Sequence, residues 1–403
     1  MSEMSYLEKL LDGVEVEWVT LGSMADIGTG SSNRQDESEN GIYPFYVRSK
    51  NILKSDTFEF DEVAIVIPGE GGIGDIFHYV EGKYALHQRA YRIRITTNAV
   101  DTKFLYYFMS SSFKQYILTK SVGATAISIR KPMLEGFKVP IPSPDNPEKS
   151  LAIQSEIVRI LDTFTALTAE LTAELDMRKK QYNYYRDQLL SFKDGEVEWK
   201  TLGDVTKKWY SGGTPTAGKI EYYENGNIPW LRTQEVKFSE IDSTEIKITQ
   251  AALKNSSAKW IPRNCVIIAI SGATAGRSAI NKIPLTTNQH CGCLEIDDTK
   301  ALYRYVFHWV SFNYENIKSL GQGARGDLNS TIIKNFKLPI PYASDPQKSL
   351  KEQARIVEIL DKFDTLTNSI TEGLPREIEL RQKQYEYYRD LLFSFPKPET
   401  VSN

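Results

Sequence analysis

The stretch QSEIVRILDTF at residues 154–164 occurs again as QARIVEILDKF at residues 353–363, and this repeat decides the fold of the 403-residue chain. Three other segments also occur twice, in the same order in both halves: VEWVTLG (16–22) with VEWKTLG (197–203), FKVPIP (137–142) with FKLPIP (336–341), and KKQYNYYRDQLLSF (179–192) with QKQYEYYRDLLFSF (382–395). The offsets along the chain are 181, 199, 199 and 203 residues. Long internal repeats determine the architecture, so the chain is built from two related halves.

The segments between the repeats differ from each other. Residues 23–136 and 204–335 share only short turn-like pieces, such as YPFYVRS (43–49) beside IPWLRTQ (228–234). Both alternate β-rich runs with Gly-rich turns, at 63–95 and at 266–296. This pattern predicts two small α/β domains with hairpins, and an α+β fold class for the whole chain.

The repeated blocks after these domains are predicted to be long helices. Residues 154–192 contain no Pro or Gly, and heptad a/d spacing is kept at Leu161, Phe164, Thr168, Leu171, Leu175, Arg178, Tyr182, Tyr185, Leu189 and Phe192. Such spacing indicates a coiled-coil seam. The alternative is an amphipathic helix packed only on its own domain.

The second helical block repeats the seam with an interruption. The seam positions are Leu360, Phe363, Thr367 and Ile370, then Ile378, Arg381, Tyr385, Tyr388, Leu392 and Phe395. Gly373-Leu374-Pro375 lies between the two runs, and Pro predicts a kink or a break there. The Pro-rich segments VPIPSPDNPEKS and LPIPYASDPQKS are expected to be hinges before the helix starts.

Composition narrows the class of protein without deciding it. A net charge of −3 does not indicate nucleic acid, but a basic face on an acidic chain remains compatible with DNA binding. Three cysteines form no disulfide framework and favour a reducing cytoplasm. No run of about 18 apolar residues or signal-peptide pattern is present, so no membrane association is expected.

The alternation of two unlike domains with two near-identical helical blocks resembles the DNA-specificity subunit of type I restriction-modification systems. The phrases SGGTPTAGKIEYYENGNIPWLRTQEV (211–236), IVEILDKFDTL (356–366) and QYEYYRDLLFSF (384–395) are typical of that family. The tandem TAELTAEL at 168–175 places the chain near the type IC branch. The resemblance covers essentially the whole chain.

This resemblance implies an architecture and a set of partners. Residues 1–150 and 194–349 would be target-recognition domains, each for one half of a split site in double-stranded DNA. Residues 151–193 and 350–397 would be conserved helical spacers that form an antiparallel coiled coil in a pseudo-twofold circular arrangement. The spacers would dock two modification subunits, which methylate adenine, and two motor-nuclease subunits would complete the restriction enzyme. The chain itself would be non-catalytic and bind no cofactor, because S-adenosylmethionine, ATP and Mg²⁺ belong to the partners.

The resemblance suggests a hypothesis for the tandem repeat, that it sets the spacing between the two half-sites. The repeat consists of Thr168, Ala169, Glu170, Leu171, Thr172, Ala173, Glu174 and Leu175. One four-residue unit lengthens a helix by about 6 Å and rotates it by about 40°. Because DNA rises about 3.4 Å per base pair, each unit would shift the gap between half-sites by one or two base pairs. The alternative is a replication-slippage remnant in a tolerant helix.

Residue type and position in turns suggest candidate DNA contacts. Arg suits guanine edges and Asn or Gln suits adenine edges, whereas Lys and Arg also bind phosphates. The candidates are Arg34, Arg48, Lys50, Asn51, His87, Gln88, Arg89, Arg130 and Lys131 in the first domain, and Lys219, Arg232, Gln234, Arg277, Asn288, Gln289 and Arg325 in the second. An ordinary solvated side chain is the alternative for each. Six tyrosines are placed equally in the two helical blocks, which favours packing or subunit docking over stacking on DNA: Tyr182, Tyr184, Tyr185, Tyr385, Tyr387 and Tyr388. We take Tyr182, Tyr185, Tyr385 and Tyr388 as the docking candidates.

Several motifs are expected to be decoys. GTPTAGKI (213–220) lacks the final Ser/Thr of a phosphate loop, and GEGGIG (69–74) is predicted to be a hairpin turn. His290-Cys291-Gly292-Cys293 has no second ligand pair at zinc-finger spacing, which favours buried thiols in a strand and no metal. Asp145-Asn146-Pro147-Glu148 is not an adenine-methyltransferase signature. The rivals to a DNA-binding scaffold are a lone methyltransferase or nuclease, and a coiled-coil interaction protein with no DNA role.

Overall fold

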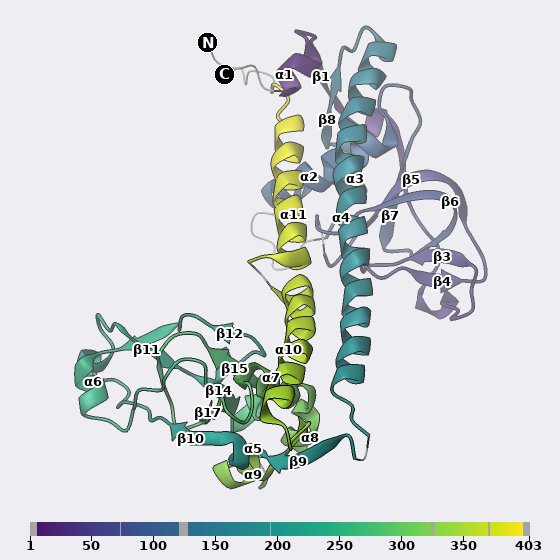
Figure 1. Ribbon diagram of the computed structural model, residues 1–403. Coiled ribbons are helices and arrows are strands. Elements are labelled where there is room, and N and C mark those ends of the chain that lie inside the picture. Colours follow the sequence, from purple (N-terminus) through teal and green to yellow (C-terminus); the bar gives the residue numbers. More distant parts are fainter. Residues whose placement is uncertain are drawn as a thin grey trace. The chain divides into compact units, whose positions relative to one another are not determined.

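The computed structural model describes residues 6–72, 74–120, 128–193, 195–323, 326–369 and 371–397. It divides into two compact units, one formed by residues 1–173 and 377–403 and the other by residues 174–376. Each unit combines a sheet-rich part with segments of long helices, which confirms the predicted mixed α/β class (Figure 1). Within the described ranges no helix is both long and apolar enough to span a bilayer.

The first unit contains a six-stranded sheet in the order β2-β7-β5-β6-β3-β4. Strand β5 lies inside this sheet, and its run AIVIP (64–68) is buried because it carries apolar side chains on both faces. The elements are α1 (Tyr6–Leu11), β1 (Val16–Thr20), β2 (Ala25–Thr29), β3 (Tyr43–Tyr46), β4 (Leu53–Ser55), β5 (Phe60–Pro68), β6 (His78–Leu86), β7 (Ala90–Ile95), α2 (Thr102–Lys120), α3 (Lys131–Glu135) and β8 (Lys138–Pro142).

The second unit follows the same plan with a divided sheet, in the orders β10-β17-β14-β15-β12 and β13-β11-β16. Strands β15 and β16 occupy the place that the single strand β6 has in the first unit. The elements are β9 (Val197–Thr201), α5 (Leu202–Val205), β10 (Thr206–Ser211), β11 (Ile228–Leu231), β12 (Glu240–Ile241), β13 (Ile246–Ile248), α6 (Gln250–Lys254), β14 (Val266–Ala269), β15 (Ser278–Asn281), β16 (Thr286–Thr287), β17 (Cys291–Ile296), α7 (Tyr303–Phe312), α8 (Tyr314–Ser319), α9 (Ser330–Asn335) and β18 (Lys337–Pro341).

Two of the repeated sequence segments pair with each other inside each unit. In the first unit β1 pairs antiparallel with β8, with Trp18 opposite Pro140. In the second unit β9 pairs with β18 in the same register, with Trp199 opposite Pro339. Each pair of strands therefore joins the start and the end of its sheet-rich part just before the chain enters a long helix. This explains why these distant segments are repeated together.

The repeated helical blocks form α4 (Pro147–Leu189), α10 (Pro346–Asn368) and α11 (Gly373–Leu392). The predicted break in the second block is confirmed, whereas α4 is continuous. Gly373 has φ +80°, and a Cβ atom there would lie 2.3 Å from the carbonyl oxygen of Thr365. Pro375 falls in the first turn of α11, where its missing N–H costs nothing. The helices begin at Pro147 and Pro346, inside the Pro-rich segments, so the last four residues of each expected hinge belong to a helix.

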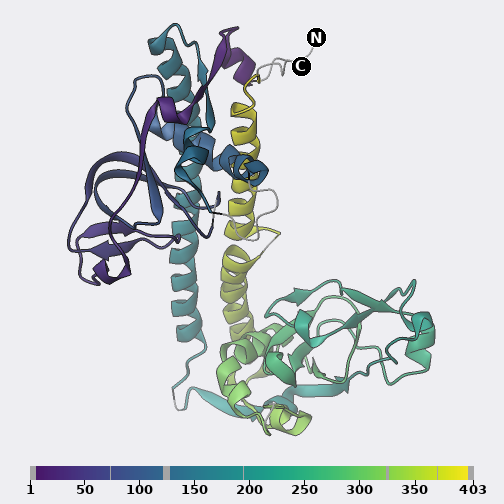
Figure 2. The same cartoon turned by 180° about the vertical axis from the view of Figure 1, so that it is seen from behind.

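The seam residues contact partners inside each unit. In the first unit Phe164 stacks on Tyr388 with ring centroids 5.4 Å apart, and α11 lies beside α4 in both views (Figures 1 and 2). In the second unit Phe363 stacks on Tyr182 and Tyr185, at 6.1 and 5.5 Å. Each unit thus pairs a part of α4 with a helix of the other repeat. Ile370, also assigned to the seam, lies outside the described residues.

The first turns of the helices also pack on their own domains. Ile157 and Leu161 are buried in the core of the first unit, and Ile356 and Leu360 are buried at the equivalent positions of the second. The first turns therefore pack on their own domains, including the predicted seam positions Leu161 and Leu360, and the aromatic contacts between helices come in the turns that follow.

Candidate nucleic-acid interface

Four loops of the first unit meet at one end of its strands. Ser32 N donates to Leu86 O at 3.1 Å, and His87 N donates to Tyr46 O at 2.9 Å. Gly69 N donates to the carbonyl oxygen of Arg89 at 2.9 Å, which brings the loop after β5 to the same place. A Cβ atom on Gly30 would lie 1.8 Å from Leu86 O, so this approach requires glycine.

The second unit builds the same backbone arrangement from a different sequence. Asn288 N donates to Leu231 O at 3.2 Å, and Ile270 N donates to His290 O at 2.9 Å. A Cβ atom on Gly212 would lie 1.8 Å from Thr287 O, as at Gly30. The loops of the two units therefore match position by position, so that residues 87–89 correspond to residues 288–290.

The first residue of each matched turn is buried and shapes the turn. Nδ1 of His87 accepts a hydrogen bond from Arg89 N at 3.0 Å, and Oδ1 of Asn288 accepts one from His290 N at 3.0 Å. Burial, and then the charges of Arg48 and Arg89, lower the pKa of His87, which favours the neutral ring that this hydrogen bond needs. His87 and Asn288 were candidates for base contact, and the structure places both in the turn itself.

The exposed residues of the loops differ between the units. In the first unit Glu70 accepts hydrogen bonds from Arg48 at 3.0 Å and from Arg89 at 3.2 Å, and Gln88 is exposed between them. Lys50 and Asn51 follow on the same exposed loop.

The second unit places a serine, a histidine and a glutamine at the corresponding positions. Gln289 Oε1 accepts from Thr214 Oγ1 at 2.7 Å, and Ser271 Oγ lies 2.6 Å from His290 Nδ1. Gln289 Nε2 also lies 3.2 Å from His290 Nε2. Ser271 stands where the first unit has Glu70, and His290 stands where it has Arg89.

The segment before α3 joins the cluster of the first unit. Ile129 N donates to Gly69 O at 2.9 Å, which puts exposed Arg130 next to these loops. Leu328 N donates to Ile270 O at 2.7 Å at the equivalent place in the second unit. Arg325, predicted from this part of the sequence, lies outside the described residues.

Other predicted residues lie in different settings. Arg34 is almost fully exposed, at 90%, whereas Arg232 is half-buried and pairs with Glu235 and Glu245. Arg277 is half-buried beside the loop after β14, Gln234 is exposed after β11, and Lys131 lies 3.8 Å from Glu135 along α3.

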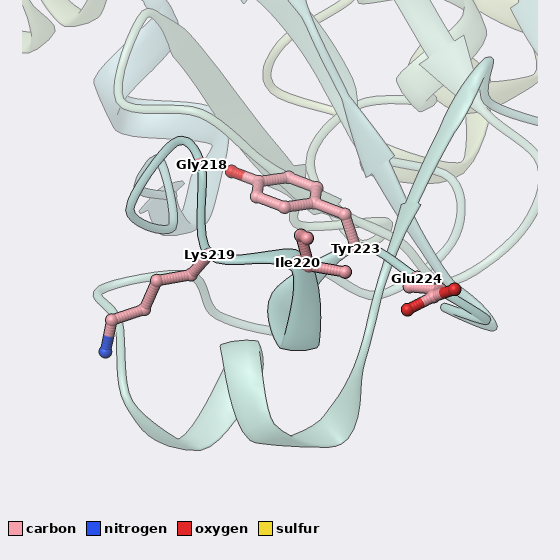
Figure 3. Close-up of a pocket in the computed structure, with 5 residues that line it drawn as sticks. All are labelled: Gly218, Lys219, Ile220, Tyr223 and Glu224. Atoms are coloured by element: carbon pink, nitrogen blue, oxygen red, sulfur yellow. The ribbon is translucent and has the colours of Figure 1, made fainter.

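Lys219 lies at the rim of a shallow hollow of about 260 Å³ in the second unit (Figure 3). Its Nζ is 4.8 Å from the ring centroid of Tyr222, and Ile220 beside it is 70% exposed. The residues of GTPTAGKI form a loop with a turn at Ala217 and Gly218.

The cysteine motif forms part of a buried strand, as expected. Cys291 and Cys293 lie in β17, and burial raises the pKa of Cys291 to about 12, so its thiol is protonated at neutral pH. Among the residues that the structure describes, no three His, Cys, Asp or Glu side chains are grouped to hold a metal ion. The GEGGIG segment connects antiparallel β5 and β6, which confirms the hairpin, with residue 73 undescribed.

Comparison with known proteins identifies the family to which a chain with two such loop clusters belongs. A family model described as "Type I restriction modification DNA specificity domain" matches residues 13–177 and again residues 195–380. The chain belongs to this family of type I specificity subunits.

Full-length relatives agree with this assignment. The chain is 46% identical over 424 residues to the EcoR124I/EcoR124II type I restriction enzyme specificity subunit of Escherichia coli, with 100% of both chains covered. It is 30% identical to a putative type I restriction enzyme specificity subunit of Haemophilus influenzae, covering 97% of this chain and 98% of the relative. The chain is therefore a specificity subunit, a class that is not itself enzymatic.

Solved structures support the fold. The S subunit of a type I restriction-modification system from M. genitalium matches with a TM-score of 0.64 and 17% identity, covering 96% of this chain and 98% of that one. At this identity the match concerns the fold alone.

The specificity subunit seats each sheet-rich part on its helix with equivalent polar contacts. Gln154 Oε1 accepts from Asp101 N at 2.8 Å, and Gln353 Oε1 accepts from Leu302 N at 2.9 Å. Both glutamine side chains are completely buried. Each glutamine therefore hydrogen-bonds to backbone atoms of the attached domain and to a serine side chain of its own helix, which leaves the side chains of the attached domain free to vary.

A second seat contact uses side chains. In the first unit Asp162 accepts from Lys103 Nζ at 2.7 Å and from Tyr107 OH at 2.6 Å. In the second unit Asp361 accepts from Arg304 Nε at 2.6 Å and lies 2.7 Å from His308 Nε2. A carboxylate on the helix thus holds a cation and a second polar group from the domain in both units.

The tyrosines of the specificity subunit fall into two groups. Tyr182 packs against the core of the second unit, and burial raises its pKa to about 12, whereas Tyr385 packs against the core of the first. Tyr185 and Tyr388 stack on a helix in their own unit while remaining 40% exposed.

The most exposed tyrosines were not among the predicted docking residues. Tyr184 is 62% and Tyr387 66% exposed, at equivalent positions of the repeat. Leu380, Tyr387 and Tyr388 line a hollow of about 390 Å³, and Met177 is 53% exposed at the position equivalent to Leu380. Heptad phase could have separated these outward tyrosines from the seam.

Proposed function

We propose that each unit of this specificity subunit recognises one half of a bipartite site in double-stranded DNA. One observation carries the proposal. The two units present matched backbone loops whose exposed and half-buried side chains differ, Arg48-Glu70-Arg89 against Thr233-Ser271-His290. A constant scaffold with variable polar groups is suited to two base sequences, because base edges are distinguished by donor and acceptor pattern.

The division of labour among the candidate contacts follows from their exposure. Exposed cations on and around the loop clusters, apart from Arg48 and Arg89, are proposed to bind phosphates, which position the protein without specifying sequence. This group is Arg34, Lys50, Arg130, Lys131 and Lys219. The other exposed groups of the clusters are proposed to contact base edges. His87, Asn288 and Arg232 are proposed to act by holding loop shape.

The tandem TAEL repeat is proposed to set the gap between the half-sites. The division between the units falls after Ala173, within the repeat, and α4 is helical throughout this region. Thr168, Leu171 and Leu175 are half-buried, whereas Glu170 and Ala173 are exposed, as the seam predicts. Extra units would therefore lengthen a helix shared by both units without changing any loop that contacts DNA.

The partner subunits are proposed to supply all chemistry. Two modification subunits, with S-adenosylmethionine, would methylate adenine, and two motor-nuclease subunits, with ATP and Mg²⁺, would complete the restriction complex. Each repeat offers one exposed surface for docking, formed by Met177, Tyr184 and Tyr185 in one and Leu380, Tyr387 and Tyr388 in the other. The cytoplasm, where the DNA lies, suits the free thiols.

Gln289→Ala tests the recognition role. We expect the complex with modification subunits to bind its site on the order of tenfold more weakly, because one bidentate base contact is lost. Methylation should become permissive at one base pair of one half-site only. Gln250→Ala, an exposed glutamine of the same unit outside the loops, is the matched control. If both variants keep wild-type affinity and motif, Gln289 contacts no base.

Tyr184→Ser and Tyr387→Ser test the docking surfaces. Each exposed aromatic is expected to act as an interface anchor, so each variant should lose on the order of tenfold or more in affinity for a modification subunit. Native mass spectrometry should detect one modification subunit on each single variant and none on the double variant. Ile220→Ser, which removes an equally exposed apolar side chain elsewhere, should still bind two. Two subunits on the double variant would place docking on another surface.

A further inference from the structure

Three charged side chains from three separate loops meet in the first unit. Arg48 follows β3, Glu70 follows β5, and Arg89 precedes β7. A single carboxylate oxygen, Oε2 of Glu70, accepts from Nη1 of Arg48 at 3.0 Å and from Nη1 of Arg89 at 3.2 Å. The backbone of these loops is fixed by the hydrogen bond from Gly69 N to Arg89 O. The triad is thus held in place by the sheet.

The stability of the fold does not account for this triad. The side chains of Arg48, Glu70 and Arg89 are 45%, 45% and 57% exposed. Ion pairs that are so exposed contribute little to stability, because water and salt screen them. The arrangement also brings two like charges together at the loop end. A role in binding explains it better than a role in folding.

Within the part of the chain that the structure describes, the recognition edges of both arginines form no hydrogen bond. A guanidinium carries five N–H donors in a planar fork, and each arginine gives only Nη1 to Glu70. The other donors can form the bidentate pair with O6 and N7 of guanine, which is the commonest specific arginine contact. The carboxylate meanwhile repels phosphates and holds each fork in orientation.

The second unit has no such triad at the matched positions. Ser271 replaces Glu70, His290 replaces Arg89, and Thr233 corresponds to Arg48 in the aligned strands. The triad of two arginines and a glutamate is therefore particular to the first unit and is not a shared feature of the two loop clusters.

We propose that Glu70 is a specificity-determining residue of the first unit, which orients Arg48 and Arg89 to read guanine in its half-site. This inference rests on the proposed function, since it assumes that the unit reads DNA. The half-site of the first unit then contains at least one G·C pair contacted by these arginines. Glu70 increases discrimination more than affinity, because it opposes the use of the two arginines as general phosphate binders.

The test compares Glu70→Gln with the wild type, both in complex with modification subunits. We expect binding to DNA without the site to strengthen several-fold, while the ratio of specific to nonspecific binding falls on the order of tenfold. The methylated motif should become permissive at a G·C pair of the first unit's half-site, with the other half-site unchanged. Glu81→Gln, an exposed residue of β6 in the same unit, removes the same charge and should keep the ratio.

Arg89→Lys provides a second test that keeps the net charge. Because lysine lacks the fork, this variant should lose the same discrimination while its salt dependence stays the same. An unchanged ratio in both Glu70→Gln and Arg89→Lys, or an equal change in Glu81→Gln, would overturn the role of Glu70. So would a first half-site without any G·C pair. A wild-type complex with no sequence preference would instead refute the proposed function itself.

Discussion

A third Thr-Ala-Glu-Leu unit inserted after Leu175 is expected to widen the gap in the methylated site by one or two base pairs and to leave both half-sites unchanged. Four helical residues add about 6 Å and about 40°. This matches the rise of one to two base pairs of DNA, at about 3.4 Å each. The insertion lies within α4 and touches no loop of either recognition cluster. Affinity for the original site should fall by orders of magnitude, because only one half-site can then be contacted.

The gap between the half-sites is expected to depend on the length of the repeat and not on its sequence. Deletion of residues 172–175 should narrow the gap by the same amount. Thr172→Ala keeps the length and removes only the hydrogen bond from Thr172 Oγ1 to Thr168 O, so it should leave the gap unchanged. Methylation by the insertion variant at the original spacing would show that α4 does not set the gap.

Asp361→Ala is expected to lower the free energy of unfolding of the second unit by about 2–4 kcal/mol. The second unit should therefore unfold at a lower denaturant concentration. The carboxylate holds Arg304 Nε and His308 Nε2, and His308 is buried. Removing it leaves these donors without their acceptor, although Arg304 keeps Glu240. Hydrogen exchange should accelerate in α7 and leave α2 of the first unit as it was.

Asp162→Ala is the matched variant in the first unit. It removes the acceptor of Lys103 and Tyr107, so exchange should accelerate in α2 and not in α7. Equal loss of protection in both helices from either variant would mean that these contacts do not seat the units individually.

The same carboxylate gives the second unit an acid dependence. Burial opposes ionisation of Asp361, but hydrogen bonds from His308 and Arg304 prevail and lower its pKa below the ordinary value of 3.8. A lowered pKa stabilises the fold above the unfolded-state value, and this stabilisation is lost as the pH falls through the folded value. Below about pH 4 the free energy of unfolding of the second unit should therefore fall less steeply with falling pH in Asp361→Ala than in the wild type.

The sequence predicted the features that repeat and missed those created by distant contacts. The two halves, the two helical blocks and the break at Gly373 all follow from local pattern and residue chemistry, whereas the helices begin at Pro147 and Pro346, earlier than expected. Heptad phase separates inward Tyr182 from outward Tyr184, but which part of the other repeat each helix packs on is set by distant contacts that no local rule gives.

The candidate site shows the same limit. Arg48, Gln88 and Arg89 could be selected by residue type, and the structure brings them to one loop cluster. Glu70 could not, because an acidic residue is a poor candidate for DNA contact until its two arginines are seen around it. His87 and Asn288 were selected by type too, but their side chains complete a turn that becomes visible only when the matched backbones are compared.

Mapping of N6-methyladenine across a host genome tests the central claim most directly. The wild-type chain would be expressed with the modification subunit of its system in a host that lacks other methylation. We predict methylation at a single split motif, two short half-sites separated by a fixed gap. Methylation at a continuous motif, or none from a complex shown to be intact, would contradict recognition of a bipartite site by the two units.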